Sequence, residues 1–302
     1  MLTTSSAVEI ASRVATRLNL SAEVLVTHCF PNGQIEVVPP RPRSGIDEIC
    51  LFQCFPDRVN DRLVELLLAL QAISFLSPRQ LTIVLPYLPY TRSDKPVSEG
   101  AFIPFTAIAH CLQQFGITRL VTAELHVPQL SAAFGFPVVE VDMMPIFAQH
   151  LHPVDGGATV VVSPDLGGAK RAERLATALG VPMAVMRKTR HGSVKESIEI
   201  LGQVKHKCAI LVDDEVNSGE SLISAAQLAL RAGATAAIAV VVHPLLTPEA
   251  IGRIEQSPLQ HIFMSDSIPL ISASTQTSKM KVLSLAEVLA EVLHPVAKFA
   301  AS

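Results

Sequence analysis

The stretch CAILVDDEVNSGES (208–221) decides the fold class. An apolar run, Ala209 to Val212, leads into the adjacent carboxylates Asp213 and Asp214, and a small polar turn at 217–219 follows them. The next residues, SLISAAQLALRAGA (221–234), carry apolar side chains at helical spacing. The stretch therefore predicts a buried strand, a polar loop and a helix in succession, which is the repeating unit of an α/β protein.

Short β-rich runs alternate with helical patterns along the rest of the chain. The runs expected as strands are EICLFQCF (48–55), LTIVLPYL (81–88), RLVTAEL (119–125), ATVVVSPD (158–165), PMAVMRK (182–188), CAILVDD (208–214) and AAIAVVVH (236–243). The runs expected as helices are DRLVELLLALQAI (61–73), FTAIAHCLQQFG (105–116), AKRAERLATALG (169–180) and GESLISAAQLALRAG (219–233). Continuously apolar strands that alternate with helices predict an α/β fold, a mostly parallel sheet with helices on both faces.

The two halves of the chain have similar sequence patterns. A length of 302 residues suits two domains of about 150 residues each. LPYLPYTRSDK (85–95) in the first half and LVDDEVNSGES (211–221) in the second occupy similar places in the strand-loop-helix order. We expect two similar domains, 1–145 and 146–283, and a terminal amphipathic helix within 284–302 that packs back on the first domain.

The chain is apolar, with 49% hydrophobic residues and a mean hydropathy of +0.39, yet it offers no membrane span. A membrane helix needs about 20 consecutive apolar residues, and the most apolar stretch, 63–76, is interrupted by Glu65 and Gln71. We therefore expect a buried helix there. The net charge of −3 and the lack of a basic run argue against a nucleic-acid partner, which requires a positive face.

The five cysteines and the amino-terminal sequence predict a reduced, cytoplasmic protein. MLTTSSAVEI (1–10) lacks the basic start and apolar core of a signal peptide. Cys50 and Cys54 lie four residues apart in ICLFQCF (49–55), which places both on one face of the expected strand. Too few other ligands stand nearby for a metal site, so we expect both thiols to be buried.

Open α/β sheets bind ligands at the carboxyl ends of their strands, and Asp213 and Asp214 stand at such an end. Their carboxylates can accept hydrogen bonds from vicinal sugar hydroxyls, or hold a cation. Residues 217–221 then turn into a helix, so that backbone N–H groups and hydroxyls converge in an anion nest suited to a phosphate. The combination predicts a phosphorylated sugar; the simpler interpretation is a helix cap with surface acids.

LVDDEVNSGES also resembles the diphosphate-sugar loop of the type I phosphoribosyltransferase fold, in which two acids precede a small turn. Further motifs resemble those of the ribose-phosphate pyrophosphokinase (PRPP synthase) family. They are FPNGQIEV (30–37), PYLPYTRSDK (86–95), VTAELHVPQ (121–129) and VVSPDLGGAKRAERLA (161–176), together with VNDRLVELLLALQA (59–72) and MSDSIP (264–269), which have no obvious chemistry. The resemblance extends through nearly the whole chain, with the extreme amino terminus the weakest part.

This resemblance implies transfer of a diphosphoryl group from Mg-ATP to ribose 5-phosphate, giving PRPP and AMP. The residues it implies for ATP are Phe30, Asn32, Gln34, Arg92, Ser93, Asp94 and His126. Those it implies for ribose 5-phosphate are Asp213, Asp214, Asn217, Ser218, Gly219, Glu220 and Ser221. The implied Mg²⁺ ligands are His126 and Asp165, while Lys188 and Arg190, on a mobile loop, would stabilise the transition state. The family also implies a homodimer or a hexamer built from dimers.

Each of these residues has a simpler interpretation when taken alone. His126 would be a core histidine, Asp165 a helix cap, Arg92 a solvated charge and Phe30 a packing residue. The four cations of RKTRHGSVKE (187–196) would belong to a solvated edge. The agreement of several motifs in the same order favours the functional interpretation.

The sequence departs from the family pattern at four positions. The family usually has an aspartate, a glycine, an acid and a glutamine at the positions of Asn217, Glu220, Gln34 and Ser93. Glu220 is the least expected, because a carboxylate beside a phosphate is unfavourable unless the side chain turns away. The departures at Gln34 and Ser93 bear on the choice and affinity of the nucleotide.

Two other functions stay open. One is a non-catalytic homologue that keeps the fold and associates with active subunits, and the other is a phosphoribosyltransferase, which consumes PRPP. Retention of the acids, the histidine and the two implied catalytic cations argues against the first. The adenine-type hairpin at 30–37 and the two similar halves argue against the second.

Overall fold

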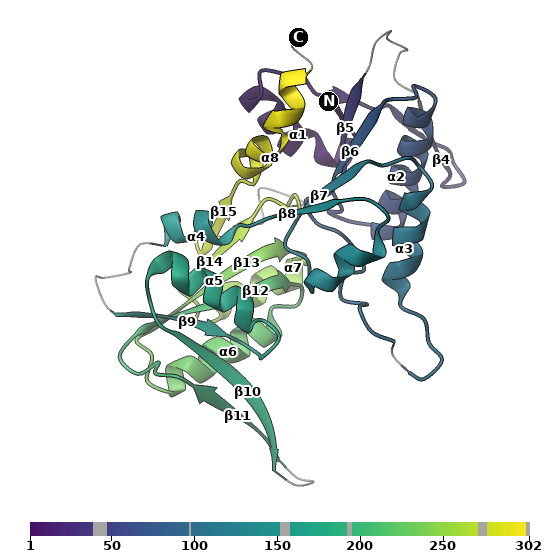
Figure 1. Cartoon of the computed structure of the whole chain (residues 1–302). Helices are drawn as coiled ribbons and strands as arrows, with labels where there is room; N and C mark the ends of the chain where they lie inside the picture. The colour runs from purple at the N-terminus through teal and green to yellow at the C-terminus, as the bar shows by residue number, and fades with distance from the viewer. Residues whose placement is uncertain (39–46, 97, 152–157, 192–194, 271–276, 300–302) are drawn as a thin grey trace. The chain divides into compact units, whose positions relative to one another are not determined.

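The computed structural model describes residues 1–38, 47–96, 98–151, 158–191, 195–270 and 277–299 (Figure 1). The chain divides into two compact units. Unit 1 comprises Met1–Asp142, Ser267–Pro269 and Ser284–Ser302, and unit 2 comprises Met143–Asp266 and Leu270–Leu283. The chain therefore builds most of unit 1, then unit 2, and returns to unit 1 at its end.

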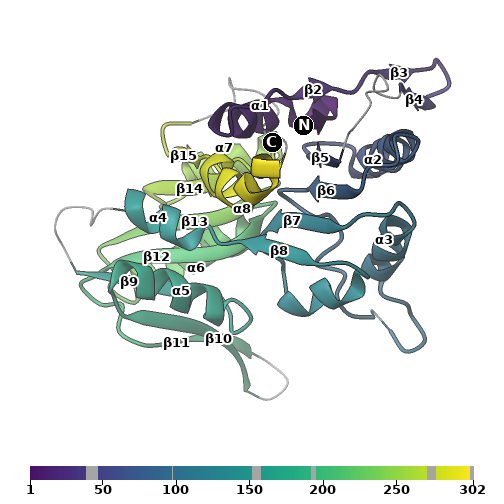
Figure 2. The ribbon, with the colours of Figure 1, turned by 45° about the horizontal axis from the view of Figure 1, so that its top comes forward.

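Unit 1 contains a parallel sheet with the strand order β2-β1-β5-β6-β7-β8. The strands are β1 (Leu2–Thr3), β2 (Glu23–Val24), β5 (Glu48–Phe52), β6 (Gln80–Val84), β7 (Arg119–Ala123) and β8 (Val138–Val141). The helices are α1 (Val8–Arg17), α2 (Val59–Ser74), α3 (Pro104–Gln113) and α8 (Ala286–Phe299), with 3-10 turns at Ser5–Ala7 and Pro128–Ala133. A separate hairpin, β3 (Thr27–Cys29) and β4 (Ile35–Val37), packs its second strand against α2 (Figure 2).

Helix α8 packs against α1, and Figure 2 shows the two helices side by side. Leu285, Leu289 and Leu293 are buried at intervals of four residues, so one apolar stripe of the terminal segment faces the unit. An ion pair between Arg17 and Glu287, 3.6 Å apart, joins the exposed sides of the two helices.

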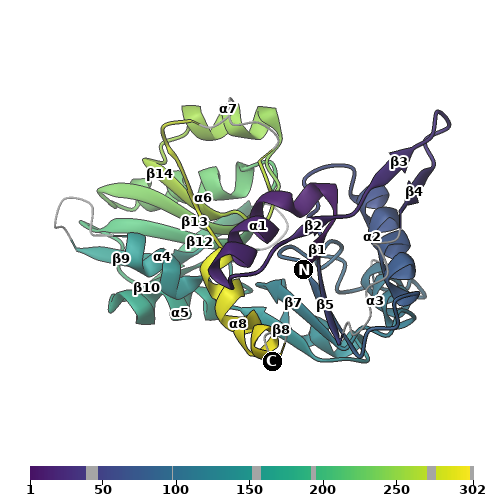
Figure 3. The ribbon, with the colours of Figure 1, turned by 90° about the horizontal axis from the view of Figure 1, so that it is seen from above.

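Unit 2 contains a sheet with the order β11-β10-β9-β12-β13-β14-β15. Its strands are β9 (Thr159–Ser163), β10 (Met183–His191), β11 (Lys195–Leu201), β12 (Cys208–Val216), β13 (Ala236–Pro244), β14 (His261–Ser265) and β15 (Met280–Leu283). Its helices are α4 (Met144–His150), α5 (Ala169–Leu179), α6 (Glu220–Arg231) and α7 (Pro248–Gln256). The pairs are parallel except that β11 runs antiparallel to β10. Figure 3 shows α6 and α7 on one side of this sheet and α5 on the other, with α4 beside α5.

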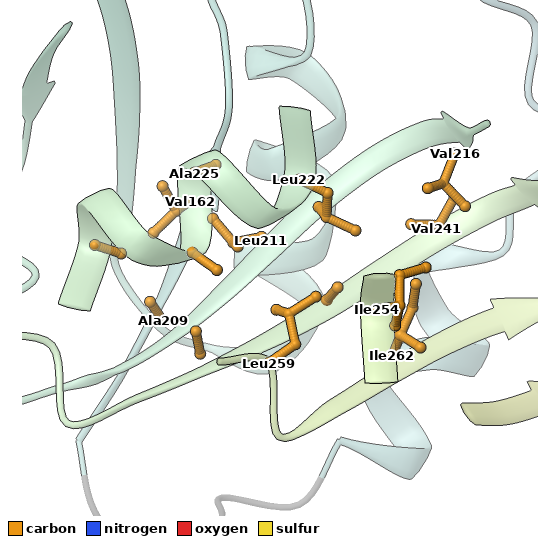
Figure 4. Close-up of a cluster of buried hydrophobic side chains, with 14 of the residues drawn as sticks. Val162, Ala209, Leu211, Val216, Leu222, Ala225, Val241, Ile254, Leu259 and Ile262 are labelled. Carbon is orange, nitrogen blue, oxygen red and sulfur yellow. The ribbon is translucent and has the colours of Figure 1, made fainter. Parts of the chain in front are cut away.

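The core between this sheet and helices α6 and α7 is built from small and β-branched side chains (Figure 4). Ala209 and Leu211 alternate with residues of the opposite face along β12, and they meet Leu222 and Ala225 of α6. The other face is covered by α5, where Ala172, Leu175 and Ala176 are buried. A strand that buries both of its faces reads as a continuous apolar run, and the predicted α/β fold with mostly parallel sheets flanked by helices is confirmed.

The predicted strands and helices are all present, with shifted ends. The apolar segment around 63–76 lies in α2, where Leu66, Leu70 and Ile73 are fully buried. Among the described residues, no helix has the length and hydropathy to span a membrane. Cys50 and Cys54 are free and buried, as predicted, but Cys54 follows the end of β5, so the placement of both on one strand was wrong. Burial raises the pKa of the Cys50 thiol to about 12, so this thiol is unreactive.

Candidate active site

The acids of the opening stretch lie inside β12, close to its carboxyl end. The strand was predicted to end at 214, but it continues to Val216, because Glu215 and Val216 still pair with His243 and Pro244 of β13. The turn after it reaches Gly219, whose φ of +77° favours glycine, and α6 begins at Glu220. The predicted succession of strand, polar turn at 217–219 and helix is confirmed.

Asp213 and Asp214 share a buried cation, Arg171 of α5. The guanidinium Nη1 of Arg171 lies 3.9 Å from Oδ1 of Asp213 and 3.6 Å from Oδ1 of Asp214. Arg171 and Asp214 are 7% and 4% exposed, so the positive charge balances the acids where water contributes little. The backbone N–H of Asp214 also donates to Oδ1 of Asp213 at 2.9 Å, which orients the more accessible carboxylate.

The pKa of Asp213 is raised to about 7, first because burial disfavours the charged carboxylate. A hydrogen bond with the Asp214 side chain and the charge of that side chain raise it further, while Arg171 lowers it. Asp213 therefore exchanges its proton near neutral pH, unlike an ordinary aspartate.

The turn at 217–219 exposes polar groups and packs against α7. Asn217 and Ser218 are exposed, Gly219 is buried, and the backbone N–H of Glu220 donates to the Ser218 hydroxyl at 3.4 Å. A Cβ atom at Gly219 would lie 3.3 Å from Ile254 of α7, so close packing adds to the φ requirement for glycine. The amino terminus of α6, with its backbone N–H groups and positive dipole end, follows this turn.

The Glu220 side chain is directed toward a cation on α7. Its Oε1 accepts from Nη1 of Arg253 at 3.2 Å, and the two side chains are 69% and 45% exposed. The conflict expected between this carboxylate and a phosphate at the turn is therefore avoided in this structure, because the carboxylate is engaged on the outer side of the helix.

Asp165 follows β9, the strand that neighbours β12 in the sheet. Its Oδ1 accepts from the backbone N–H of Gly168 at 2.9 Å, and its backbone oxygen accepts from the Ser163 hydroxyl at 2.6 Å. A Cβ atom at Gly168 would lie 2.9 Å from the Ser163 hydroxyl and 3.4 Å from the Arg171 guanidinium. The two glycines of the loop therefore let the chain pass close to Asp165 and Arg171, and Asp165 caps the loop before α5.

Two predicted nucleotide-binding segments of unit 1 follow adjacent parallel strands. Residues 86–95 follow β6, and His126 follows β7; the backbone N–H of Ala123 donates to the oxygen of Pro86 at 3.1 Å, which holds the two strand ends together. His126 is half-buried and Arg92 is exposed. In the same loop Lys95 lies 4.0 Å from Asp94.

The third predicted nucleotide segment is the tip of the β3–β4 hairpin. Phe30 is 47% exposed there, so its ring is not a core residue. Asn32 donates through Nδ2 to Oε1 of Gln34 at 3.0 Å and accepts through Oδ1 from the Gln34 backbone N–H at 3.1 Å. The tip therefore presents an aromatic ring beside an ordered pair of amides.

Lys188 and Arg190 lie in β10, opposite Ile198 and Glu196 of β11. The expectation that this segment leaves its strand at 188 to form a loop was wrong, because the backbone continues in antiparallel pairing with β11 as far as His191. An ion pair between Arg187 and Glu199, which are partners in the register of the two strands, joins their side chains at 2.7 Å. The side chains of Lys188 and Arg190 are not among those described, and residues 192–194 lie outside the described residues.

Family models match both parts of the chain. Residues 1–116 match the N-terminal domain of ribose phosphate pyrophosphokinase, and residues 163–299 match the phosphoribosyl synthetase-associated domain. The ribose-phosphate pyrophosphokinase of Thermosipho africanus is 35% identical over 295 residues, covering 97% of this chain and 91% of that protein. The chain belongs to the ribose-phosphate pyrophosphokinase family.

Other ribose-phosphate pyrophosphokinases extend this likeness. Ribose-phosphate pyrophosphokinase A of Dictyostelium discoideum is 31% identical over 295 residues, with 97% of this chain and 93% of that protein covered. The crystal structure of the phosphoribosylpyrophosphate synthetase from Mycobacterium smegmatis matches 99% of this chain and 98% of its own, with a TM-score of 0.89 and 29% identity. The family and its phosphoribosyltransferase-type fold, inferred from the motifs, are both confirmed.

Sequence reasoning about this ribose-phosphate pyrophosphokinase homologue missed Arg171. The signal was available in AKRAERLA (169–176), where Arg171 stands at the edge of the stripe formed by Ala172, Leu175 and Ala176. A cation in the first turn of a helix, on the stripe that faces the sheet, indicates an acid on the sheet. The two acids at the end of β12 are that partner.

Proposed function

We propose that this chain transfers the β,γ-diphosphoryl group of Mg-ATP to the 1-hydroxyl of ribose 5-phosphate, forming PRPP and AMP. The 1-hydroxyl oxygen attacks the β-phosphorus and loses its proton, while the bond from the β-phosphorus to the oxygen shared with the α-phosphate breaks. The observation that carries this proposal is the cradle at the end of β12, where Asp213 and Asp214 stand beside the turn and the start of α6. It provides acceptors for sugar hydroxyls and, at the turn and the start of α6, donors for a phosphate.

The residues act by positioning and by charge. Asp213 and Asp214 accept hydrogen bonds from the sugar hydroxyls, and residues 217–221 hold the 5-phosphate. Phe30, Asn32 and Gln34 hold the base, and Arg92, Ser93 and Asp94 belong to the segment that takes the phosphates of ATP. Lys188 and Arg190 stabilise the charge that develops on the transferred group. Transfer in one step forms no covalent bond to the protein.

Mg²⁺ would neutralise charge on the ATP phosphates, and His126 and Asp165 are the residues that would hold it. Among the described side chains, no three His, Cys, Asp or Glu residues gather into a metal site. Magnesium is commonly bound through one or two carboxylates together with water and substrate phosphates, and the Asp165 carboxylate is a donor of that kind. Asp165 is exposed, so its carboxylate can meet a ligand.

The domain roles and the assembly belong to the same proposal. Residues 1–145 form the ATP-binding domain and residues 146–283 the ribose-phosphate domain, each phosphoribosyltransferase-like, and 284–302 is the terminal helix that returns to the first domain. The protein acts as a homodimer or a dimer-based hexamer in the cytoplasm. Size-exclusion chromatography with light scattering measures the assembly.

A non-catalytic homologue is the second candidate. It is favoured by the description of the model that matches 163–299, a phosphoribosyl synthetase-associated domain. The same experiment tests both candidates: the purified protein is incubated with ATP, Mg²⁺ and ribose 5-phosphate, and AMP and PRPP are measured. Equal amounts of both products support the synthase, whereas sugar-phosphate binding without AMP formation supports the non-catalytic homologue.

The raised pKa of Asp213 predicts that KM for ribose 5-phosphate increases as the pH falls through 7, because a protonated carboxyl accepts sugar hydroxyls less well. In an Asp214→Asn variant, the midpoint of this pH dependence should move to lower pH, since the hydrogen bond and the charge that raise the Asp213 pKa are lost. Initial rates at pH 5.5–8.5 measure both midpoints. The substrate's own phosphate titrates identically in both proteins, so an unchanged midpoint contradicts the prediction.

The Glu220–Arg253 ion pair predicts a small effect on KM for one substitution and a larger effect for another. Glu220→Gly should change KM for ribose 5-phosphate less than about threefold, because the carboxylate already faces Arg253. Arg253→Ala releases the carboxylate toward the turn and should raise KM by about two- to fivefold at low salt, with less effect at high salt. If Glu220→Gly instead lowers KM tenfold, the carboxylate faces the phosphate in solution.

A further inference from the structure

Helix α2 begins with the motif VNDRLVELL (59–67), which contains a buried acid that the proposed reaction does not use. Glu65 is 2% exposed in the second turn of α2. Its Oε1 accepts from the hydroxyl of Thr27, at the start of the β3–β4 hairpin, at 3.1 Å. Thr27 pairs with Val37 of β4, which is 8% exposed, and β4 packs against α2, so the base of the hairpin is attached to this helix by packing as well as by the hydrogen bond.

A cation from the same helix orients this acid. Nη1 of Arg62 lies 3.0 Å from Oε2 of Glu65, so Thr27 and Arg62 occupy different oxygens of one carboxylate. The guanidinium is fixed in turn by Oδ1 of Asp57 at 3.3 Å and by the Ser5 hydroxyl at 3.4 Å. A buried carboxylate held from both sides has little freedom to rotate, which makes it a precise support for a hairpin.

The first turn of α2 holds a second segment. The hydroxyl of Tyr90 donates to Oδ1 of Asn60 at 2.6 Å. Tyr90 has a φ of +67°, which is unfavourable for a residue with a side chain, and the backbone N–H of Ser93 donates to its carbonyl oxygen at 2.9 Å. The Asn60 contact therefore stabilises a strained turn immediately before Arg92 and Asp94.

We propose that the first two turns of α2 are a common anchor for the two nucleotide-binding segments: Glu65, through Thr27, positions the hairpin for the base, and Asn60, through Tyr90, positions residues 91–94 for the phosphates. The proposal rests on the proposed function, because that function assigns the two segments to ATP. Glu65 and Asn60 are positioning residues. They act on nucleotide binding alone, since every contact described for them lies within unit 1.

The two arms of the anchor can be measured separately. The chain has no tryptophan, so Phe30→Trp introduces a single fluorescent reporter at the hairpin tip, and its quenching yields dissociation constants for ATP and for adenosine. In this background, Glu65→Gln should weaken ATP and adenosine about tenfold each, because the hairpin contacts the base. Tyr90→Phe should weaken ATP by about three- to tenfold and adenosine by less than twofold, because its segment contacts the phosphates.

A double-mutant cycle tests whether Glu65 acts through Thr27. Thr27→Val removes the same hydrogen bond from its other side. If Glu65 acts through Thr27, the dissociation constant of the double variant for ATP should exceed that of the weaker-binding single variant by no more than about twofold. If Glu65→Gln does not fold, Thr27→Val alone still measures how much the hydrogen bond between Thr27 and Glu65 contributes to ATP affinity. Glu9→Gln, which removes an exposed ion pair with Arg13 on α1, is the matched control and should change neither constant.

Three results would overturn the anchor. They are unchanged ATP affinity in Glu65→Gln and Thr27→Val, equal losses of ATP and adenosine in Tyr90→Phe, and a rise in KM for ribose 5-phosphate that parallels the loss of ATP affinity. The last result would indicate general destabilisation. Equilibrium dialysis with labelled ATP replaces the reporter if its emission does not respond. If the protein binds ATP normally but forms no AMP, the proposed function is wrong. The ATP and adenosine titrations still test whether α2 is the anchor of the two segments.

Discussion

Lys188→Ala is expected to lower kcat by roughly a thousandfold or more while KM for ribose 5-phosphate changes less than about threefold. The reason lies in where charge accumulates. As the diphosphoryl group leaves AMP, negative charge grows on the transferred oxygens, and a cation there stabilises the transition state more than either substrate. In the proposed function the sugar is held elsewhere, by Asp213, Asp214 and the turn before α6.

The matched control for this prediction is Lys281→Ala, which removes an exposed lysine from β15, a strand of the same sheet. It should leave both constants unchanged. Single-turnover rates with excess enzyme separate the chemical step from product release. A Lys188→Ala variant with nearly normal kcat and a greatly raised KM would show instead that Lys188 contributes to binding, and the catalytic assignment would fail.

The sequence predicted the elements whose patterns are local. The run before Asp213 is apolar on every residue because β12 is buried on both faces, and the helix after Gly219 shows its spacing directly. The two-residue strand β1 was not predicted, because such a strand has too few residues to establish a period. The extension of β10 to His191 was missed because it depends on pairing with β11, a later strand that contributes no local signal at residues 188–191.

The site was predictable in its acids and its turn, and less so in the residues that hold them. Glu220 looked unfavourable because its partner, Arg253, stands 33 residues later on another helix. Arg171 was not singled out from the sequence, and the packing of α5 against the sheet places it beside two carboxylates. Contacts between elements that are distant in sequence decide which charges are balanced, so the charge pattern alone was ambiguous at both positions.

Arg171→Met is expected to destabilise unit 2 by about 3 kcal/mol at pH 8, because removal of one partner of a buried ion pair leaves uncompensated charge. Asp213 and Asp214 would then face each other without their cation. Since Arg171 lowers the pKa of Asp213, its loss should move that pKa above its value of about 7. KM for ribose 5-phosphate should rise as well, because a protonated Asp213 accepts sugar hydroxyls poorly.

The pH dependence of this defect distinguishes charge from packing. The missing ion pair stabilises the folded state only where the acids are ionised, so the deficit should be full at pH 8 and shrink as the pH falls through 7 toward 5. A cavity left by the shorter side chain would lower the free energy of unfolding by the same amount at pH 8 and at pH 5. Thermal unfolding at pH 8 and pH 5 measures the difference, with Lys170→Met, an exposed change one residue earlier in α5, as the control.

Adding Asp214→Asn to Arg171→Met should restore part of the lost stability, because one carboxylate then needs no cation. A further loss would mean that Arg171 stabilises α5 by packing rather than by charge.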